Sequence, residues 1–149
     1  MSDAAAQPGR PRPFWVGWLL AVTGMGALLG LAFVALPGPM QDAFNLLIFG
    51  DGATPKGFSP RAVDYLEFAF AVLGAVMVGW MVLLAIVIHG PFRAGERWAW
   101  TAVLASAGTW FAIDTTMSIA SGYPENAALN AVFGAGFGVG LWATRPTAR

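Results

Sequence analysis

Residues 110–134 read WFAIDTTMSIASGYPENAALNAVFG, and this stretch decides the fold of the chain. Two apolar segments flank the turn-forming sequence Ser-Gly-Tyr-Pro, which predicts two antiparallel helices joined at residues 121–124. Asp114 lies within the first segment and is the only charged residue in the middle of any apolar segment of the chain. Polar contacts of structural or functional importance are therefore expected within this hairpin.

Polar residues recur every four positions on both sides of the turn. Trp110, Asp114 and Ser118 follow at this interval in the first helix, and Asn126 and Asn130 in the second. Residues four apart share one face of a helix. Asn and Ser side chains hydrogen-bond between helices in membranes, so the two faces are expected to meet, with Ser118 level with Asn126.

The position of the turn predicts which residues meet deeper in the hairpin. With Gly122 as its centre, Asp114 lies eight residues before the centre and Asn130 eight residues after it. The carboxyl group of Asp114 and the amide of Asn130 are therefore expected to form a hydrogen-bonded pair. The same register predicts that Trp110 packs over Gly134, since small residues let neighbouring helices approach closely.

The composition indicates a membrane protein of a single domain. Of the 149 residues, 57% are hydrophobic and 11% charged, whereas soluble domains average about 25% charged residues. The absence of cysteine excludes disulfides, thiolate metal sites and Cys nucleophiles, and one His argues against a multi-His metal site. With zero net charge and scattered basic residues, no nucleic-acid partner is expected. No cofactor or metal is expected either.

Four apolar segments are long enough to cross a bilayer, which takes about 20 residues. They cover residues 14–36, 61–89, 98–121 and 124–143. The chain is therefore expected to be an all-α, integral membrane four-helix bundle over residues 14–143, with an outer loop at 37–60. Residues 1–13 and 144–149 are expected to be cytoplasmic tails, the first of them disordered. A cleaved signal peptide is disfavoured, because the first apolar segment exceeds the roughly 7–15 residues of a signal core.

Proline and glycine mark the expected ends of these spans. Pro37-Gly-Pro39 is expected to stop the first, Ser59-Pro60 to start the second and Gly90-Pro91 to end it. Within the outer loop, residues 40–49 are too short to span and are expected to lie flat at the interface, with their polar side chains on one face. Residues 50–57 are rich in turn-forming residues and are expected to be mobile.

Positive charge predicts the orientation of the spans. With the N-terminus inside, six of the eight basic residues are cytoplasmic, namely Arg10, Arg12, Arg93, Arg97, Arg145 and Arg149. Only Lys56 and Arg61 then lie outside. Both termini are therefore expected in the cytoplasm, and the chain in the inner membrane of a bacterium.

Asp114 is the strongest candidate for a functional residue, since ionisable residues within membrane spans are energetically costly and usually serve a function. The expected ligand or proton site comprises Asp114, Asn130, Ser118, Asn126, Thr115 and Trp110. Two interpretations remain open, an interhelical clamp without turnover and a site that couples to a proton or a ligand. A metal site is the least favoured, because only Asn130 and hydroxyl groups are expected near the carboxyl group.

A second group of acidic residues is expected at the outer surface. Asp64 and Glu67 are three apart and share a helix face. Together with Glu125 they form a candidate outer acidic cluster that attracts cations. The alternative is a solvated helix start, in which negative charge complements the helix dipole.

Several motifs carry a family resemblance. They are Trp98-Ala-Trp100, Trp110-Phe-x-Ile-Asp114-Thr-x-x-Ser118, Gly122-x-x-x-Asn126-Ala-x-x-Asn130-x-x-Phe133, Gly79-Trp80 and Gly90-Pro91-Phe92. Over about residues 60–140 the chain resembles a family of small bacterial four-helix integral membrane proteins of unknown function, and its layout is distantly similar to DoxX-like proteins. The resemblance implies the architecture and carries no activity.

No hydrolase, kinase, dinucleotide-binding or zinc-protease motif is present. The leading hypothesis is a non-enzymatic inner-membrane protein, either an accessory or scaffold subunit or a binder of lipid or another small hydrophobic molecule. It is expected to contact the lipid bilayer and to form a homo-oligomer or join a larger membrane complex. The alternative is a small transporter or channel that uses Asp114 as a protonatable intramembrane site.

Overall fold

The protein is all-α. The computed structural model describes residues 10–50 and 58–146, which contain α-helices and one π-helical turn and no strand. The elements are α1 (Pro13–Ala35), α2 (Pro37–Phe49), α3 (Pro60–Val87), η1 (Ile88–Phe92), α4 (Arg97–Ala120) and α5 (Pro124–Ala143). Helices at the four expected apolar segments are therefore confirmed, and α2 is an additional helix within the region 37–60 that was expected to be a loop.

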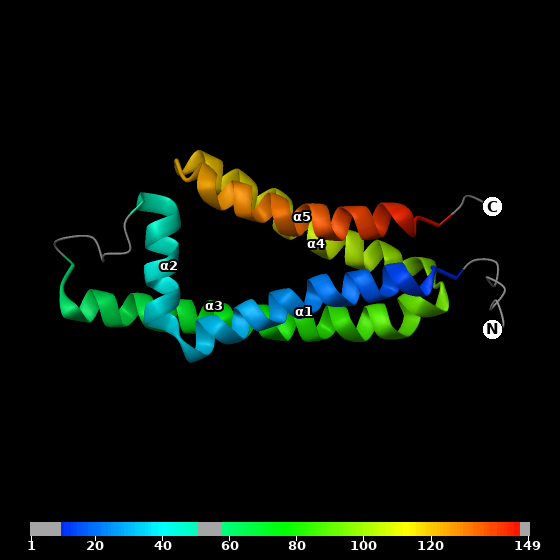
Figure 1. Cartoon of the computed structure of the whole chain (residues 1–149), viewed down its shortest axis with the longest axis horizontal. Coiled ribbons are helices and arrows are strands. Elements are labelled where there is room, and N and C mark those ends of the chain that lie inside the picture. The colour runs from blue at the N-terminus through cyan, green and yellow to red at the C-terminus, as the bar shows by residue number, and fades with distance from the viewer. Residues whose placement is uncertain (1–9, 51–57, 147–149) are drawn as a thin grey trace.

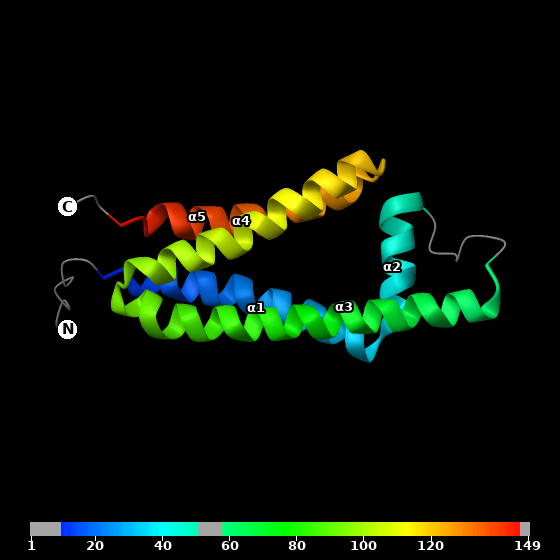
Figure 2. The ribbon, with the colours of Figure 1, turned by 180° about the vertical axis from the view of Figure 1, so that it is seen from behind.

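The long helices form two antiparallel pairs, α1 with α3 and α4 with α5 (Figure 1). The pairs pack together at the end of the molecule that holds the start of α1, the end of α5 and the connection between α3 and α4 (Figure 1). Toward the other end they diverge, and α2 crosses there roughly at right angles to the long helices (Figures 1 and 2). The molecule therefore has one closely packed end and one open end.

Two glycines set the close approach of α1 and α3. A Cβ atom added to Gly74 would lie 2.6 Å from the Cβ of Phe33 and even closer to the carbonyl oxygen of Gly30. A Cβ atom added to Gly30 would lie 3.0 Å from the Cβ of Met77. Any larger residue at Gly30 or Gly74 would thus force the two backbones apart.

The core lies at the closely packed end. Leu19 of α1, Ile88 of η1 and Val103 of α4 have no exposed surface, and Leu141 of α5 is 3% exposed. These side chains form one cluster that joins both helix pairs. The indole nitrogen of Trp18 also donates to the carbonyl oxygen of Gly136 at 2.8 Å, which fixes α1 against α5.

The expected start of the second long helix is confirmed, whereas its expected end is wrong. The Ser59 hydroxyl caps α3 by accepting a hydrogen bond from the amide of Ala62 at 3.3 Å. At the other end the helix does not stop at Gly90-Pro91 but continues through η1, where the amide of Arg93 donates to the carbonyl oxygen of Ile88. The wider π turn accommodates Pro91, which has no amide hydrogen for the usual helical bond.

Helix α2 has its polar face inward, which is a correction to the expected interfacial orientation. Gln41 and Asn45 are 4% and 9% exposed, whereas Leu46 and Phe49 on the other side are 58% and 56% exposed. The inward amides and the outward apolar side chains are the reverse of a helix that lies on a water-facing surface. The expected mobility of residues 51–57 concerns residues outside those that the structure describes.

Within residues 10–50 and 58–146, two segments are long and apolar enough to cross a membrane by length and composition, Pro13–Ala35 and Pro60–Phe92. Helices α4 and α5 are of similar length but are not among these two. Asp114 and hydroxyl residues lower the hydropathy of α4, and two asparagines lower that of α5. The polar residues from which the hairpin contacts were predicted are thus the same residues that lower the hydropathy of its two helices.

Gly74→Ala is expected to destabilise the fold by about 1–3 kcal/mol, because the added Cβ meets backbone and cannot rotate away. Gly79→Ala is the matched control on α3, since nothing lies within 4 Å of a Cβ there. Alanine favours a helix over glycine by about 0.5–1 kcal/mol, so the control should keep or gain stability. Reversible unfolding in detergent, followed by circular dichroism, compares the variants. Equal stability of the two would show that α1 and α3 do not touch at Gly74.

Candidate functional site

A cavity of about 660 Å³ lies between the two helix pairs, on the side where they diverge. All five α-helices contribute to its wall, and most of the lining is apolar. Typical lining residues are Phe33, Phe44, Leu73, Met77, Leu129 and Phe133. Val76 and Met117 also line it and are 65% and 59% exposed, so the cavity opens to the surface of the protein.

Contacts between aromatic side chains hold α2 across the end of this cavity where the two helix pairs diverge. The ring of Phe44 lies 5.4 Å from that of Phe33 on α1 and 5.8 Å from that of Phe70 on α3. Phe49, at the end of α2, meets Tyr123 in the α4–α5 turn edge to face at 6.1 Å. Helix α2 therefore bridges the two pairs at the end where they do not pack directly.

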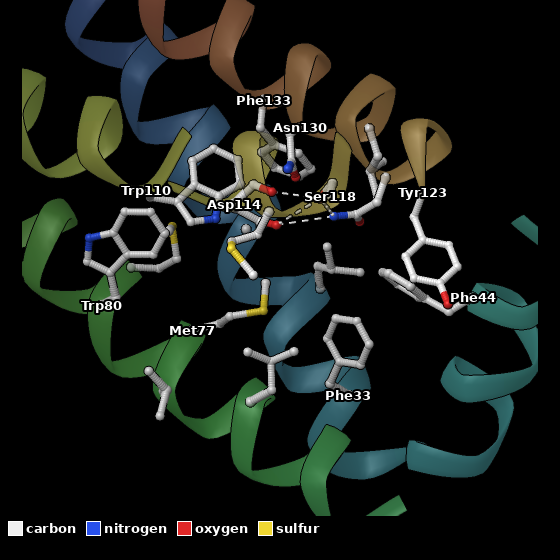
Figure 3. A pocket seen from close by; sticks show the side chains of 18 of the residues that line it. Phe33, Phe44, Met77, Trp80, Trp110, Asp114, Ser118, Tyr123, Asn130 and Phe133 are labelled. Carbon is white, nitrogen blue, oxygen red and sulfur yellow. Dashed lines mark hydrogen bonds between the residues drawn. The ribbon is translucent and has the colours of Figure 1, made fainter. Parts of the chain in front are cut away.

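The polar part of the wall is a hydrogen-bonded network across the α4–α5 hairpin (Figure 3). The side-chain amide of Asn126 donates to the Ser118 hydroxyl at 2.8 Å and to Oδ1 of Asp114 at 3.2 Å. The Ser118 hydroxyl donates to the carbonyl oxygen of Asp114 at 2.7 Å and lies 3.3 Å from Oδ1. One amide thus bonds to two residues of the facing helix, and the expected alignment of Ser118 with Asn126 is confirmed.

The expected hydrogen bond between Asp114 and Asn130 is wrong. Asn126, one turn nearer the loop, takes the place beside the carboxylate. The Nδ2 atom of Asn130 is buried without a hydrogen-bond partner among the residues that the structure describes. Asn130 is only 4% exposed and lines the cavity near Asp114 (Figure 3).

Trp110 does not pack over Gly134 as expected. A Cβ added to Gly134 would lie 2.7 Å from Cδ2 of Phe111, so Phe111 occupies that place. Trp110 turns toward α3, where its ring lies 5.8 Å from that of Trp80. The reason is geometric, because a step of four residues exceeds one 3.6-residue turn by about 40°. Trp110 lies two such steps before Ser118, so the direction of its side chain is rotated by twice this angle about the helix axis. It therefore points away from α5.

The remaining predicted site residues lie outside this network. Thr115 does not line the cavity, and its Oγ1 is buried without a hydrogen-bond partner in the described part of the chain. Asp64 and Glu67 lie in the first turns of α3, where Glu67 faces Gly38. Glu125 lies in the first turn of α5. The starts of α3 and α5 lie well apart in both views (Figures 1 and 2), so the structure does not bring the three acids into one cluster.

The chemistry available at the cavity is hydrogen bonding. Within residues 10–50 and 58–146, no group of three His, Cys, Asp or Glu side chains is placed to hold a metal ion. Oδ1 of Asp114 already accepts from Asn126, and the Asn130 amide still has hydrogens to donate. A bound molecule with a hydroxyl or carbonyl group would find both an acceptor and a donor here.

Sequence reasoning missed the apolar wall of the site. Phe33, Phe44 and Met77 line the cavity, but nothing in their spacing separates them from apolar residues on the outer surface. In a chain that is hydrophobic on all sides, cavity-facing and outward-facing positions carry the same residue types.

A double-mutant cycle tests the corrected contact. Asp114→Leu and Asn126→Leu should each lower the free energy of unfolding, and their combination should cost less than the sum by about 0.5–2 kcal/mol, because one shared interaction is lost. The matched cycle of Asp114→Leu with Asn130→Leu should be additive. Unfolding in detergent measures both cycles. The contrary result would be additive losses for Asp114→Leu and Asn126→Leu together with coupling between Asp114→Leu and Asn130→Leu. It would support the hydrogen bond between Asp114 and Asn130 that the sequence predicts.

Comparison with protein-family models, curated proteins and solved structures finds no match to this chain. The family resemblance of residues 60–140 therefore stays a prediction, and the proposals below rest on the geometry of the cavity and of the helix surfaces.

Proposed function

We propose that this protein is a four-span membrane protein that binds a small lipid-like molecule in the cavity beside Asp114. The observation that carries the binding role is the cavity itself, an apolar volume of about 660 Å³ with its polar groups gathered around Asp114. Ligand sites typically have volumes of about 300–1,000 Å³, apolar walls and few polar groups. The ligand suggested by this lining is an elongated apolar molecule with one hydroxyl or carbonyl group.

The exposed surface of the helices supports the membrane placement. Large apolar side chains point outward on every α-helix, and examples are Leu28 (68% exposed), Leu46 (58%), Phe68 (64%), Ile113 (61%) and Val132 (64%). Water-soluble proteins rarely expose extended apolar patches, because the hydrophobic effect opposes it. The outward apolar faces of α4 and α5 support counting these two helices as the third and fourth spans, despite their polar residues.

The arrangement of charges supports a placement in the bacterial inner membrane with both termini in the cytoplasm. The start of α1, the end of α5 and the α3–α4 connection lie at the same end of the molecule (Figure 1). The described arginines at that end are Arg10, Arg12, Arg93, Arg97 and Arg145, whereas Arg61 is at the start of α3. Cytoplasmic loops of inner-membrane proteins carry such an excess of basic residues.

The unpaired amide of Asn130 supports binding over a purely structural role. A buried donor without an acceptor costs about 1–3 kcal/mol, and a ligand oxygen would remove that cost. A sealed contact around Asp114 would instead have favoured a scaffold. Transport is less favoured. Leu19, Ile88 and Val103 have no exposed surface and belong to one packed cluster. This cluster lies between the cavity and the end of the molecule where α1 starts and α5 ends.

Filling the cavity should abolish binding. A long-chain alcohol that carries a photoreactive diazirine is expected to label the purified protein at cavity residues such as Met77 and Met117. Leu129→Trp adds bulk to a lining position and should reduce this labelling about tenfold, as expected from a loss of about 1.4 kcal/mol in affinity. Val132→Trp, three residues further on the same helix and 64% exposed, is the control and should label normally. Equal labelling of both variants would leave the scaffold interpretation in place.

The absence of cysteine makes the topology directly testable. Single substitutions Ser59→Cys and Glu125→Cys should react with a membrane-impermeant thiol reagent added to cells whose inner membrane is intact. Arg93→Cys and Pro146→Cys should react only after that membrane is permeabilised. All four positions are exposed, so access to the thiol depends on the membrane. Labelling of all four in intact cells would contradict the four-span topology.

A further inference from the structure

A second cavity, of about 860 Å³, lies at the end of the molecule where α1 and α4 start and α5 ends. Three chain segments that are distant in sequence form it, the residues before α1, the start of α4 and the residues after α5. Its wall is largely polar, unlike that of the cavity beside Asp114. It is therefore a separate site with different chemistry.

Four guanidinium groups line this cavity, from Arg10, Arg12, Arg97 and Arg145. Among the described residues of the lining, Glu96 supplies the one carboxylate, so four arginines and one glutamate give these side chains a net charge of +3. The Oε2 atom of Glu96 already accepts a hydrogen bond from the indole of Trp98 at 2.5 Å. The strong excess of positive charge in one concave site favours an anion.

Three of these four arginines have no carboxylate partner within the described part of the chain. Arg10, Arg12 and Arg145 form no ion pair with a carboxylate among the residues that the structure describes. The guanidinium carbon of Arg145 lies 5.6 Å from the ring centre of Trp142, a cation–π contact that leaves its outer nitrogens available. The planar fork of arginine matches the oxygens of phosphate, to which it can bond through two parallel hydrogen bonds.

Apolar surface adjoins this basic cavity. Trp15, Trp100 and Trp142 line it, and Trp142 is 70% exposed. Phe14, at the start of α1, is 67% exposed. Tryptophan is enriched at the level of lipid headgroups, and basic pockets between helices on the cytoplasmic side bind anionic headgroups.

We propose that the cavity formed by Arg10, Arg12, Arg97 and Arg145 binds a phosphate group. That phosphate belongs either to the headgroup of an anionic phospholipid or to a water-soluble phosphate compound. The site lies outside the cavity beside Asp114, so it is independent of the ligand proposed there.

The test uses the full-length protein in a zwitterionic detergent and compares three probes. They are short-chain phosphatidylglycerol, short-chain phosphatidylcholine and inorganic phosphate, and binding is followed through tryptophan fluorescence and thermal stabilisation. We expect phosphatidylglycerol to bind at least tenfold more tightly than phosphatidylcholine. Tighter binding of phosphatidylglycerol than of phosphate assigns the site to lipid, and similar binding of both assigns it to a soluble phosphate compound.

The variants Arg12→Gln and Arg145→Gln should each weaken binding of the anionic probe about tenfold, as expected from the loss of one charge-assisted contact. Arg93→Gln is the matched control, because Arg93 is exposed at the same end but does not line the cavity. Arg12→Lys and Arg145→Lys keep the charge and should retain part of the affinity, which also covers the case in which a glutamine variant does not fold.

Two results would overturn this proposal. One is equal affinity for phosphatidylglycerol, phosphate and phosphatidylcholine, and the other is an equal loss of affinity in Arg93→Gln and Arg12→Gln. The second result would mean that only the general basic charge of this end attracts anions. Because the measurement needs no bilayer and leaves Leu129 and Asp114 unchanged, its failure is distinguishable from failure of the proposed function.

Discussion

The fit of Leu19 against Gly140 joins the two halves of this molecule. A Cβ added to Gly140 would lie 2.6 Å from Cδ2 of Leu19, so only glycine lets α5 come this close to α1. The Trp18 indole adds a hydrogen bond to Gly136, one turn away on α5. Among the residues that the structure describes, no comparable contact joins the pairs at their other end, where aromatic rings of α2 bridge them instead. The cavity beside Asp114 exists because the two helix pairs are in close contact at one end and diverge at the other.

The polar network in the hairpin has two consequences for this cavity. It holds α4 against α5 through Asn126, which bonds to both Ser118 and Asp114. It also places the carboxylate of Asp114 on a largely apolar wall, close to the unpaired amide of Asn130. Hydrogen bonds in a setting without water are stronger than in water, and unpaired groups there are more costly. The carboxylate of Asp114, which helps to hold the hairpin together, would thus also help to select a polar group on a ligand.

The sequence predicts the helices well and their contacts less well. Helix positions follow from apolar length and from turn signals such as Ser59-Pro60, and these were confirmed to within a few residues. The partner of Asp114 was predicted incorrectly, because a four-residue interval was treated as one full turn and the resulting rotation was ignored. Helix α2 was expected as part of a loop, since a short apolar segment bounded by prolines gives no clear sign of where it packs. The cavity was not predictable, because it depends on how far two helix pairs diverge rather than on any local pattern.

The edge-to-face pair of Phe49 and Tyr123 has a consequence for exchange of molecules with the cavity. Such a pair contributes about 0.5–1.5 kcal/mol, which is only one to three times thermal energy at room temperature. Separating these two rings therefore costs less free energy than opening the cluster around Leu19, whose side chains are buried. If the cavity binds the proposed ligand, entry from this side would require displacement of one helix end and no partial unfolding. The tightly packed cluster around Leu19 and the weaker contact between Phe49 and Tyr123 thus lie in different parts of the molecule. Displacement of the end of α2 would leave the packed cluster unchanged.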